Sequence, residues 1–581
     1  MEFNDVKEAV LIVGAGPSGL TLAIDLARRG VRARVVERGA DLFPGSRGKG
    51  LNPRTQEVFD DLGVIDAVRR AGGPYPLVLG WEGGTRLGTH DMIERGRPTP
   101  GAPYADMWMV PQWRTARLLY ARLQELGGSV EFGTELTGLT QNADGVEARL
   151  SSADGSAATV RAAYLVAADG GRSTVRRALG IPMTGETVDP SPMLVADVRL
   201  ADVRLADVRL ADDRLDDDRL DDDRLADVRL ADDRLADDRL DDDRLADVRL
   251  DDDRLDRGHW HAWPKAKGGA VALCPLAGTD QFQLFARYED ADVDAAPDTS
   301  AEAVRQLIAE RTHLAASDVR EVSWASDFRA RAAMAERFAE GRVFLVGDAA
   351  HIHSPAGGQG LNTSVQDAYN LGWKLGQVLR HGADPALLDT YEEERLPVAA
   401  GVLGISTRIH RAHRAGDEEG ERRGPEVRQL GLNYRGGRLA VDRRPAPEDV
   451  ATEGVASEGA VRGGAAPEGA ADGYGCPRAG DRAPDAPCAR PDGEPFRLFD
   501  AFRGPHFTLL ALGDFELPPV RADFVRTYRI GGPTPDLLDP DGHIRAGYGE
   551  RGLFLVRPDG YIGFAADEEA GLGDYLAGLG G

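Results

Sequence analysis

The chain has 581 residues, long enough for about two to four domains, and its apolar content of 42% is ordinary for a water-soluble globular protein. The formal net charge of −26 argues against a nucleic-acid partner, because an acidic surface repels phosphates. The N-terminal sequence MEFNDVKEAVLIVGAG carries acidic residues before a short apolar run, and no apolar segment reaches about 18 residues, so we expect neither a signal peptide nor a membrane span.

The first elements along the chain predict a dinucleotide-binding unit. Residues 9–13 (AVLIV) have the pattern of a buried strand, and the glycine-rich turn GAGPSG follows at 14–19. The next segment, LTLAIDLARRG, predicts a helix, and RARVVE predicts a second strand that ends at Glu37. A strand, a glycine-rich turn, a helix and a strand that ends in an acid are the ordered parts of a Rossmann-type nucleotide site.

Residues of this turn have distinct expected roles toward a dinucleotide. Gly14 would make the tight turn, Gly16 would let the backbone approach a pyrophosphate, and Gly19 would let the helix pack closely on the strand. The start of the helix favours an anion, and a terminal acid would accept hydrogen bonds from ribose hydroxyls. The candidate contacts are therefore Gly14, Gly16, Pro17, Ser18, Gly19 and Glu37. FAD and NAD use such a unit alike, so these residues leave the cofactor open.

Residues 195–257 form a repeat in which Arg followed by Leu recurs at every fifth position from Arg199 to Arg254. A period of five gives no single apolar face, because Leu would advance by about 140° per repeat on a helix and would alternate sides on a strand. Asp at the inward position argues against a β-solenoid. We expect a solvated, mobile or partly helical insertion without chemistry, and the alternative is a surface that binds a partner.

The stretch GDAAHIHSPAGGQGLN at 347–362 joins a short apolar strand, 343–346, to a predicted helix, TSVQDAYNLGWKLGQVL. Glycine costs conformational entropy, so Gly357, Gly358 and Gly360 indicate a sharp turn or the close approach of a flat group to the backbone. Asn362 is a candidate N-cap of the helix, and the helix N-terminus would stabilise negative charge on a bound group.

The last part of the chain predicts a linker and a small domain. Residues from about 415 to 490 are rich in Gly, Pro, Ala, Glu and Arg, which favours a linker or a loosely packed surface. FTLLALG and LFLVRPDGYIGFAA are strand-like runs, so we expect a separate α/β domain at 485–581. The cysteines lack CxxC or metal-ligand spacing, which favours a reducing cytoplasm; they are Cys274, Cys476 and Cys488.

GDAAHIHSPAGGQGLN resembles the second FAD motif of the flavoprotein aromatic hydroxylases, the para-hydroxybenzoate hydroxylase type of group A flavoprotein monooxygenase. LVAADGGRSTVRRALGI at 165–181 resembles the DG motif of that family, so three motifs occur in family order. The C-terminal segment resembles the thioredoxin-like tail of the larger members, which act on phenols and aromatic polyketides. The resemblance implies FAD as the cofactor and NADPH or NADH as the co-substrate.

The resemblance also implies roles for particular residues. In the family, the residue at the position of Asp348 bonds the ribityl chain, and the turn from Pro355 to Gly360 lies against the isoalloxazine ring. The segments at 46–64 and 110–127 match family segments as well. The implied cofactor contacts are Arg38 and the backbone around Leu136 near the adenosine, Arg47 and Gln112 beside the flavin, Asp169 in the DG motif, and Asp348, Pro355, Gly358, Gly360, Leu361 and Asn362 around the ring.

The implied fold class is α/β, with a Rossmann-type FAD-binding domain interleaved with a β-sheet substrate domain and followed by a thioredoxin-like domain. We expect the FAD-binding domain at 1–75, 105–182 and 320–412, the substrate domain with its insertion at 76–104 and 183–319, a linker at 413–484, and the last domain at 485–581.

The implied chemistry is carried by the flavin: NAD(P)H reduces FAD, O2 adds at C4a, and the hydroperoxide delivers one oxygen to an electron-rich ring. No metal is required, and we interpret His351 and His353 as structural or loop-lining residues. Arg47 is the one candidate for a catalytic role, either positioning the flavin or gating the substrate. Five tryptophans either line a pocket for a flat substrate or pack in the core: Trp81, Trp108, Trp113, Trp260 and Trp263.

We therefore expect a monomeric or homodimeric cytoplasmic enzyme that hydroxylates a polycyclic aromatic polyketide. Three alternatives stay open: oxidation that inactivates an antibiotic, Baeyer–Villiger oxygen insertion, and a flavoprotein that sequesters a reactive pathway intermediate. A further alternative assigns the Asp-Arg repeat to docking of neighbouring enzymes.

Overall fold

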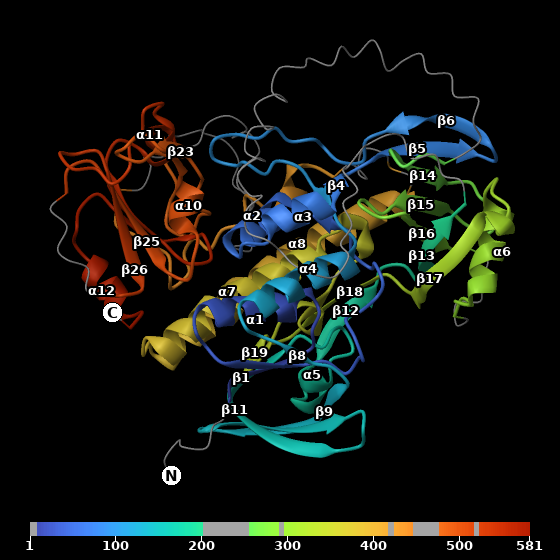
Figure 1. The fold of residues 1–581 in the computed structure, drawn as a ribbon, viewed down its shortest axis with the longest axis horizontal. Helices are drawn as coiled ribbons and strands as arrows, with labels where there is room; N and C mark the ends of the chain where they lie inside the picture. The colour runs from blue at the N-terminus through green and yellow to red at the C-terminus, as the bar shows by residue number, and fades with distance from the viewer. Residues whose placement is uncertain are drawn as a thin grey trace, which may run out of the picture.

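A computed structural model describes residues 8–201, 255–289, 296–415, 417, 423–445, 476–515 and 522–580 of the chain (Figure 1). Its α/β architecture has an eight-stranded, a seven-stranded and a five-stranded sheet. In Figure 1 the seven-stranded sheet and the C-terminal sheet lie at opposite ends, with a layer of helices between them. No helix among the described residues is long and apolar enough to cross a membrane.

The eight-stranded sheet has a parallel centre in the order β20-β11-β1-β2-β8. These strands are β1 (Glu8–Val13), β2 (Ala33–Val36), β8 (Val130–Glu131), β11 (Ala157–Ala167) and β20 (Val343–Leu345). The antiparallel additions are β9 (Thr134–Asn142), β10 (Gly145–Ser152) and β19 (Ala339–Glu340). The two predicted N-terminal strands and the predicted strand before the GDAAH stretch are thus confirmed, and they meet in one sheet.

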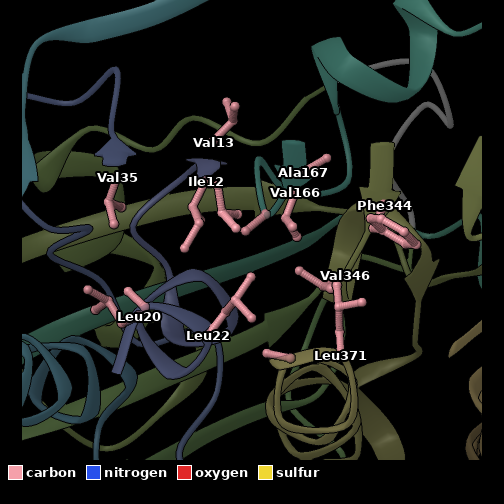
Figure 2. Packing of buried hydrophobic residues seen from close by; sticks show 14 of the residues in the cluster. Ile12, Val13, Leu20, Leu22, Val35, Val166, Ala167, Phe344, Val346 and Leu371 are labelled. Atoms are coloured by element: carbon pink, nitrogen blue, oxygen red, sulfur yellow. The ribbon is translucent and has the colours of Figure 1, made fainter. Parts of the chain in front are cut away.

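Helices α1 (Pro17–Arg28), α4 (Gln112–Glu125) and α7 (Gly360–Arg380) pack beside one another, with α1 in the middle. Figure 2 shows apolar side chains of β1, β11 and β20 meeting Leu20 and Leu22 of α1 and Leu371 of α7. The predicted helices after the glycine-rich turn and after the GDAAH stretch are both confirmed. Their packing on one sheet brings the N-terminal ends of α1 and α7, far apart in sequence, to neighbouring positions.

The seven-stranded sheet has the order β17-β13-β16-β15-β14-β5-β6. Its strands are β5 (Leu77–Glu82), β6 (Thr85–His90), β13 (Met193–Leu200), β14 (His259–Trp263), β15 (Val271–Pro275), β16 (Gln281–Arg287) and β17 (Val319–Phe328). Helix α6 (Ala301–Arg311) packs with the face that carries Leu194, Ala196 and Val198. The opposite face is turned toward the segment before α2.

The expected insertion at 195–257 needs a correction at its start. Residues 195–200, the first copy of the repeat, belong to β13 in the interior of the seven-stranded sheet, between β16 and β17. Leu200 and Leu255 are both buried in the core under α6. Residues 202–254, which hold the other copies, lie outside the described residues.

Shorter elements connect these sheets. The helices are α2 (Pro53–Asp61), α3 (Ile65–Ala71), α5 (Thr174–Ala178) and α8 (Asp389–Ala415), with 3-10 turns η5 (Ala316–Asp318), η6 (Gly347–Ala349), η7 (Pro355–Gly357), η8 (Pro385–Leu388) and η9 (Pro425–Arg428). Two small sheets hold β12 (Met183–Thr187) with β18 (Arg331–Ala335) and β21 (His351–Ile352), and β3 (Gly50–Leu51) with β7 (Trp108–Met109) and β4 (Gly73–Pro74).

The C-terminal five-stranded sheet has the order β22-β28-β27-β25-β26. Its strands are β22 (Val441–Asp442), β25 (Phe507–Leu512), β26 (Val525–Ile530), β27 (Gly552–Val556) and β28 (Ile562–Ala566), accompanied by the hairpin β23 (Pro487–Ala489) and β24 (Pro495–Arg497) and by α10 (Leu498–Phe502), α11 (His543–Tyr548) and α12 (Leu572–Ala577). The described part of the expected linker packs more tightly than its composition indicates, because β22 joins this sheet and Val427 and Tyr434 are buried.

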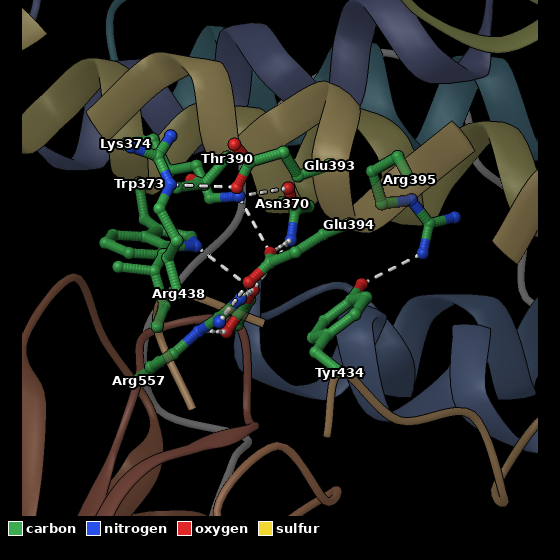
Figure 3. Close-up of polar contacts among 12 residues, drawn as sticks. Asn370, Trp373, Lys374, Thr390, Glu393, Glu394, Arg395, Tyr434, Arg438 and Arg557 are labelled. Carbon is green, nitrogen blue, oxygen red and sulfur yellow. Dashed lines mark hydrogen bonds and ion pairs between the residues drawn. The ribbon is translucent and has the colours of Figure 1, made fainter. Parts of the chain in front are cut away.

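A buried network of charges attaches the C-terminal sheet to α7 and α8 (Figure 3). Arg557, just after β27, donates to both carboxylate oxygens of Glu394 in α8 at 2.6 and 2.9 Å, and also pairs with Asp559. Glu394 accepts from Lys374 of α7 at 2.8 Å, and the Trp373 indole N–H donates to Asp559 at 3.0 Å. Helix α7, which begins at Gly360 after the GDAAH stretch, is thereby fixed just past its middle.

Candidate active site

The glycine-rich turn has the geometry of a nucleotide-binding turn. Gly14 has a φ of +108°, and a methyl group added there would lie 2.3 Å from the carbonyl oxygen of Ala168 at the end of β11. A methyl group at Gly19 would lie 2.0 Å from the carbonyl oxygen of Gly14, so helix and strand are in close contact. No atom lies within 4 Å of the equivalent position at Gly16. The turn is closed toward the protein and open at the residue expected to approach a pyrophosphate.

The N-terminus of α1 is available to an anion. Gly16 is the N-cap and makes no side-chain cap, Pro17 is the first helical residue, and Ser18 is buried. Glu37 follows β2 and accepts hydrogen bonds from the backbone N–H of Ala15 at 2.9 Å and of Gly39 at 2.8 Å. The acid therefore lies directly beside the turn, as the sequence predicts.

The loop that carries Asp348 meets this turn. A methyl group added at Gly347 would lie 3.1 Å from the Ser18 hydroxyl, so η6 and the start of α1 are in contact. Asp348 is exposed to solvent on one side, and protein surrounds the rest of its side chain where η6, the start of α1 and the DG segment meet. Its enclosure raises the pKa of the Asp348 carboxyl, against the opposing charges of His351 and Arg47.

The DG segment adjoins the same loop. Asp169 accepts the backbone N–H groups of Thr174 and Val175 through one oxygen, at 2.7 and 3.2 Å, while its buried other oxygen has no partner among the described residues. Arg176 donates to the carbonyl oxygen of Ala349 at 3.0 Å. An unpaired carboxylate oxygen in a mostly buried setting is costly and indicates a missing polar partner.

The turn before α7 is connected to the segment before α2. Asn362 is fully buried, accepts the backbone N–H of Asn52 at 2.9 Å, and donates to the carbonyl oxygens of Gly50 and Gly358, each at 2.9 Å. Our prediction that Asn362 is the N-cap is wrong: α7 begins at Gly360 and its N-cap is Gln359. The reason is that the Asn362 side chain bonds distant backbone instead of its own helix turn.

The remaining flavin-side candidates surround this connection. Gly358 has a φ of +64°, Pro355 is exposed in η7, and Gly360 opens α7. A methyl group at Gly48 would lie 3.3 Å from Leu361, and the Gly48 N–H donates to the Gln112 side chain at 2.9 Å.

Arg47 is exposed, donates to the Ser326 hydroxyl at 3.3 Å on β17, and stacks over Phe43. The contact joins the segment before α2 to the seven-stranded sheet.

The two residues that we expected near the adenosine, Arg38 and Leu136, differ in their exposure to solvent. Arg38 is exposed directly after Glu37. The Leu136 side chain is buried in the core of the eight-stranded sheet, so only its backbone in β9 is left for a ligand, as the resemblance implies.

The histidines after Asp348 form a chain of hydrogen bonds in which His351 is buried and His353 is half-buried. His351 bonds Asp367 at 2.5 Å, and His353 bonds His351 at 3.0 Å. Asp367 also pairs with Arg395 at 2.8 Å. Burial lowers the pKa of His353 to about 3, which keeps this imidazole neutral near pH 7. Within the described residues no group of three or more His, Cys, Asp or Glu could hold a metal ion.

Trp81, Trp260 and Trp263 lie on the seven-stranded sheet and divide between its two faces, whereas Trp108 and Trp113 lie in β7 and α4. Trp81 and Trp263 stack at 5.9 Å in the core under α6, so core packing is their role. Trp260 points to the other face, where an apolar cluster is formed by Tyr75, Ile93, Met107, Met109 and Cys274. Trp108 and Trp113 stack with Arg69 and Arg117.

Two of the residues in this region were not singled out from the sequence. Asn52 is the N-cap of α2 and bonds Asn362; an Asn before Pro53 was a readable sign of a helix start. Lys49 lies with its ammonium 4.4 Å from the Trp260 ring, and no local pattern indicated that contact.

Comparison with known proteins agrees with this geometry. Residues 7–214 and 239–406 match the family described as the FAD binding domain, and residues 476–580 match the aromatic-ring hydroxylase C-terminal family. The chain is 40% identical to a flavin-dependent monooxygenase of Mycobacteroides abscessus over 98% of this chain and 99% of that protein. It is 32% identical to aklavinone 12-hydroxylase of Streptomyces purpurascens over 98% and 97%.

Among solved structures, the ternary complex of aklavinone-11 hydroxylase with FAD and aklavinone superposes with a TM-score of 0.72 at 30% identity, covering 100% of this chain and 99% of that chain. The match therefore extends over all three sheets, including the C-terminal thioredoxin-like part. With its glycine-rich turn, Asp348 loop and C-terminal sheet in the arrangement described above, the chain belongs to the FAD-dependent aromatic-ring hydroxylases, a family of flavin monooxygenases.

Proposed function

We propose that this enzyme uses FAD, NAD(P)H and O2 to hydroxylate a polycyclic aromatic substrate of the polyketide type. The observation that carries the proposal is the meeting of three distant segments: the start of α1, the η6 loop with Asp348, and the DG segment with Asp169. Relatives named for aklavinone and for anhydrotetracycline match nearly the whole chain, which supports a large, flat, oxygen-bearing substrate.

The residues where these segments meet fit FAD. The open position at Gly16 and the N-terminus of α1 suit a pyrophosphate, Glu37 suits a ribose, and the enclosed but accessible Asp348 suits a polyol chain. The unpaired oxygen of Asp169 supplies a further acceptor. The proposed FAD contacts are Gly14, Gly16, Pro17, Ser18, Gly19, Glu37, Arg38, Arg47, Gln112, the backbone at Leu136, Asp169, Asp348, Pro355, Gly358, Gly360, Leu361 and Asn362. When bound, FAD supplies the hydride acceptance and oxygen-transfer chemistry that no side chain provides.

The protein's own contribution is to hold the substrate ring beside the turn from Pro355 to Gly360, here called the flavin turn, and to exclude water. Gly358 lies next to the apolar cluster, since a methyl group at Gly358 would be 3.9 Å from the Met107 side chain. The cluster's Tyr75, Met107 and Met109 offer apolar and aromatic contacts to a flat ring system. The α7 N-terminus, next to this turn, favours negative charge on a group bound there.

We further propose that the enzyme acts in the cytoplasm as a monomer or homodimer. The free thiols of Cys274, Cys476 and Cys488 support a reducing compartment. Gel filtration with light scattering would give the oligomeric state.

The test is NAD(P)H oxidation by the FAD-loaded enzyme, with and without a panel of polycyclic phenols, followed by mass spectrometry of the products. We expect oxidation that a substrate accelerates and a product heavier by one oxygen, which derives from 18O2. Oxidation that yields only hydrogen peroxide with every phenol would contradict the hydroxylase and favour a flavoprotein that sequesters an intermediate.

A further inference from the structure

One face of the seven-stranded sheet carries a polar corner beside the apolar cluster. Side chains alternate along β13, so Leu194, Ala196 and Val198 enter the core under α6 and Asp197 points to the other face. Its register partner on β16 is Gln283, which in turn pairs with Cys274 of the cluster on β15. Asp197 is thus a carboxylate inside a strand that is paired on both sides, where a buried charge is costly unless a partner stabilises it.

Asp197 is 1% exposed, and its carboxylate lies against the hydroxyl and the backbone N–H of Ser46 without a well-formed hydrogen bond to either. Ser46 lies in the segment that covers this face and is itself fully buried. Burial raises the pKa of Asp197 to about 6, against the opposing effects of Ser46 and Lys49. Near pH 8 the site therefore holds a carboxylate whose nearest opposing charge is Lys49.

Lys49 and Arg423 each bring a cation to the apolar cluster, and Arg423 is engaged by the Tyr75 hydroxyl, to which it donates at 3.3 Å. The Lys49 ammonium lies 4.4 Å from the Trp260 ring centre and donates a hydrogen bond to the Gln283 side-chain oxygen. Gln283 in turn donates to the carbonyl oxygen of Ser46. The next residue, Gly50, is in contact with the Met107 side chain and with the Asn362 that holds the flavin turn. The half-buried Lys49 side chain therefore lies next to the apolar cluster, and the residue after it is bonded to Asn362 of α7.

We propose that Lys49 is a substrate-positioning residue that binds a phenolic oxygen of the aromatic substrate, with Asp197 as its buried counter-charge. This inference rests on the proposed function and deepens it by naming the substrate feature that is recognised. A mostly apolar pocket gains orientation from one placed polar group, and a partly desolvated ammonium binds an oxygen anion more strongly than in water. The bound phenol should consequently ionise at a lower pH than the free phenol, and the two residues should affect this ionisation in opposite directions.

The experiment measures equilibrium binding of 2-hydroxyanthraquinone and of 9,10-anthraquinone to the FAD-loaded enzyme without NAD(P)H, by difference absorption. The phenolate of the hydroxylated probe has its own visible band, so a pH titration reports the ionisation of the bound molecule. For Lys49→Met we expect about tenfold weaker binding of 2-hydroxyanthraquinone and less than about twofold change for anthraquinone. Lys49→Arg should recover part of the difference between the probes, and Lys265→Met, at an exposed site in the turn between β14 and β15, should change neither.

Asp197→Asn provides the second arm. Removing the counter-charge should lower the pH at which the bound phenol ionises, whereas Lys49→Met should raise it toward the value of the free phenol. Equal effects of Lys49→Met on both probes, or shifts of the same sign in the two variants, would overturn the inference. Because no turnover is measured, an enzyme that binds with this pattern but forms no hydroxylated product would overturn only the proposed function.

Discussion

The substitution Arg557→Met tests how strongly the buried network of charges attaches the C-terminal sheet to helices α7 and α8. Arg557 is fully buried and makes two bonds each to Glu394 and Asp559, at 2.6 to 3.0 Å. Burial alone would raise the pKa of Glu394, but Arg557 and then Lys374 lower it to about 2. Breaking a buried ion pair from one side costs about 3–5 kcal/mol, because the partner charge stays behind.

The structure places the expected cost at the lower end of that range. After the substitution, Glu394 keeps the Lys374 ammonium at 2.8 Å and the Asn370 amide at 2.7 Å. Asp559 keeps the Trp373 indole N–H at 3.0 Å, and the Met side chain fills most of the space of the arginine stem. We therefore expect a loss of about 3 kcal/mol in the local free energy of opening, which is roughly 150-fold faster amide exchange.

The assay is hydrogen exchange of the backbone amides of β27 and β28, compared between the wild type and Arg557→Met. The matched control is Arg438→Met, which removes an arginine from the same region but breaks a half-exposed pair with Glu393 at 2.9 Å. We expect the control to cost less than about 1 kcal/mol, because exposed ion pairs are weak. Equal exchange in the two variants, or no change in Arg557→Met, would refute the reasoning.

Three further predictions concern the nucleotide-binding turn, the turn before α7 and the sheet face. Gly14→Ala should abolish retention of FAD, because the new methyl group would lie 2.3 Å from the Ala168 carbonyl oxygen. The readout is the ratio of absorbance at 450 and 280 nm, and the control Gly401→Ala, with no atom within 4 Å of the new methyl group, should retain FAD. Asn362→Ala should weaken FAD binding by about 1–3 kcal/mol by equilibrium dialysis, since it leaves buried backbone groups of Asn52, Gly50 and Gly358 without their partner; undiminished affinity would show that the turn is held otherwise. The pKa of Asp197 is raised from 3.8 to about 6 in the folded chain, so the folded chain binds more protons than the unfolded chain between these pH values. The contribution of Asp197 to the free energy of unfolding therefore falls as the pH rises, by about 1.4 kcal/mol from pH 5 to 8. In urea titrations Asp197→Asn should lack this decrease, and a parallel pH dependence of the two proteins would contradict the assignment.

The amino-acid sequence alone predicted those elements whose pattern lies within one continuous segment of the chain. The strand before Gly14, the helix after it and the acid at Glu37 lie within one continuous segment, so periodicity and glycine spacing predict them together. The long helix after the GDAAH stretch was predicted for the same reason. These elements are also the ones that the eight-stranded sheet places around the proposed FAD site.

The errors came from partners that are distant in the chain. Asn362 is not an N-cap because its bonds run to backbone around Asn52, which is 310 residues away. The strand β22 has two residues and exists only because β28 accepts it as an edge, so its composition indicated a linker. Contacts of this kind have no period in the sequence and become visible only when the sheets are assembled.

The two faces of the seven-stranded sheet limit how many copies of the Asp-Arg repeat can lie in β13. Because side chains on a strand alternate with a period of two, residues five apart lie on opposite faces. In β13 the copy ADVRL places Asp197 on the face toward the segment before α2, and Val198 and Leu200 in the core under α6. A further copy in the same strand would direct its Asp into that apolar core, where an unpaired carboxylate is costly. The sheet can therefore use one copy of the repeat, and β13 ends at Leu200. The copy that it uses puts Asp197 beside Gln283, which accepts a hydrogen bond from Lys49, and this is the place of the phenol contact proposed above.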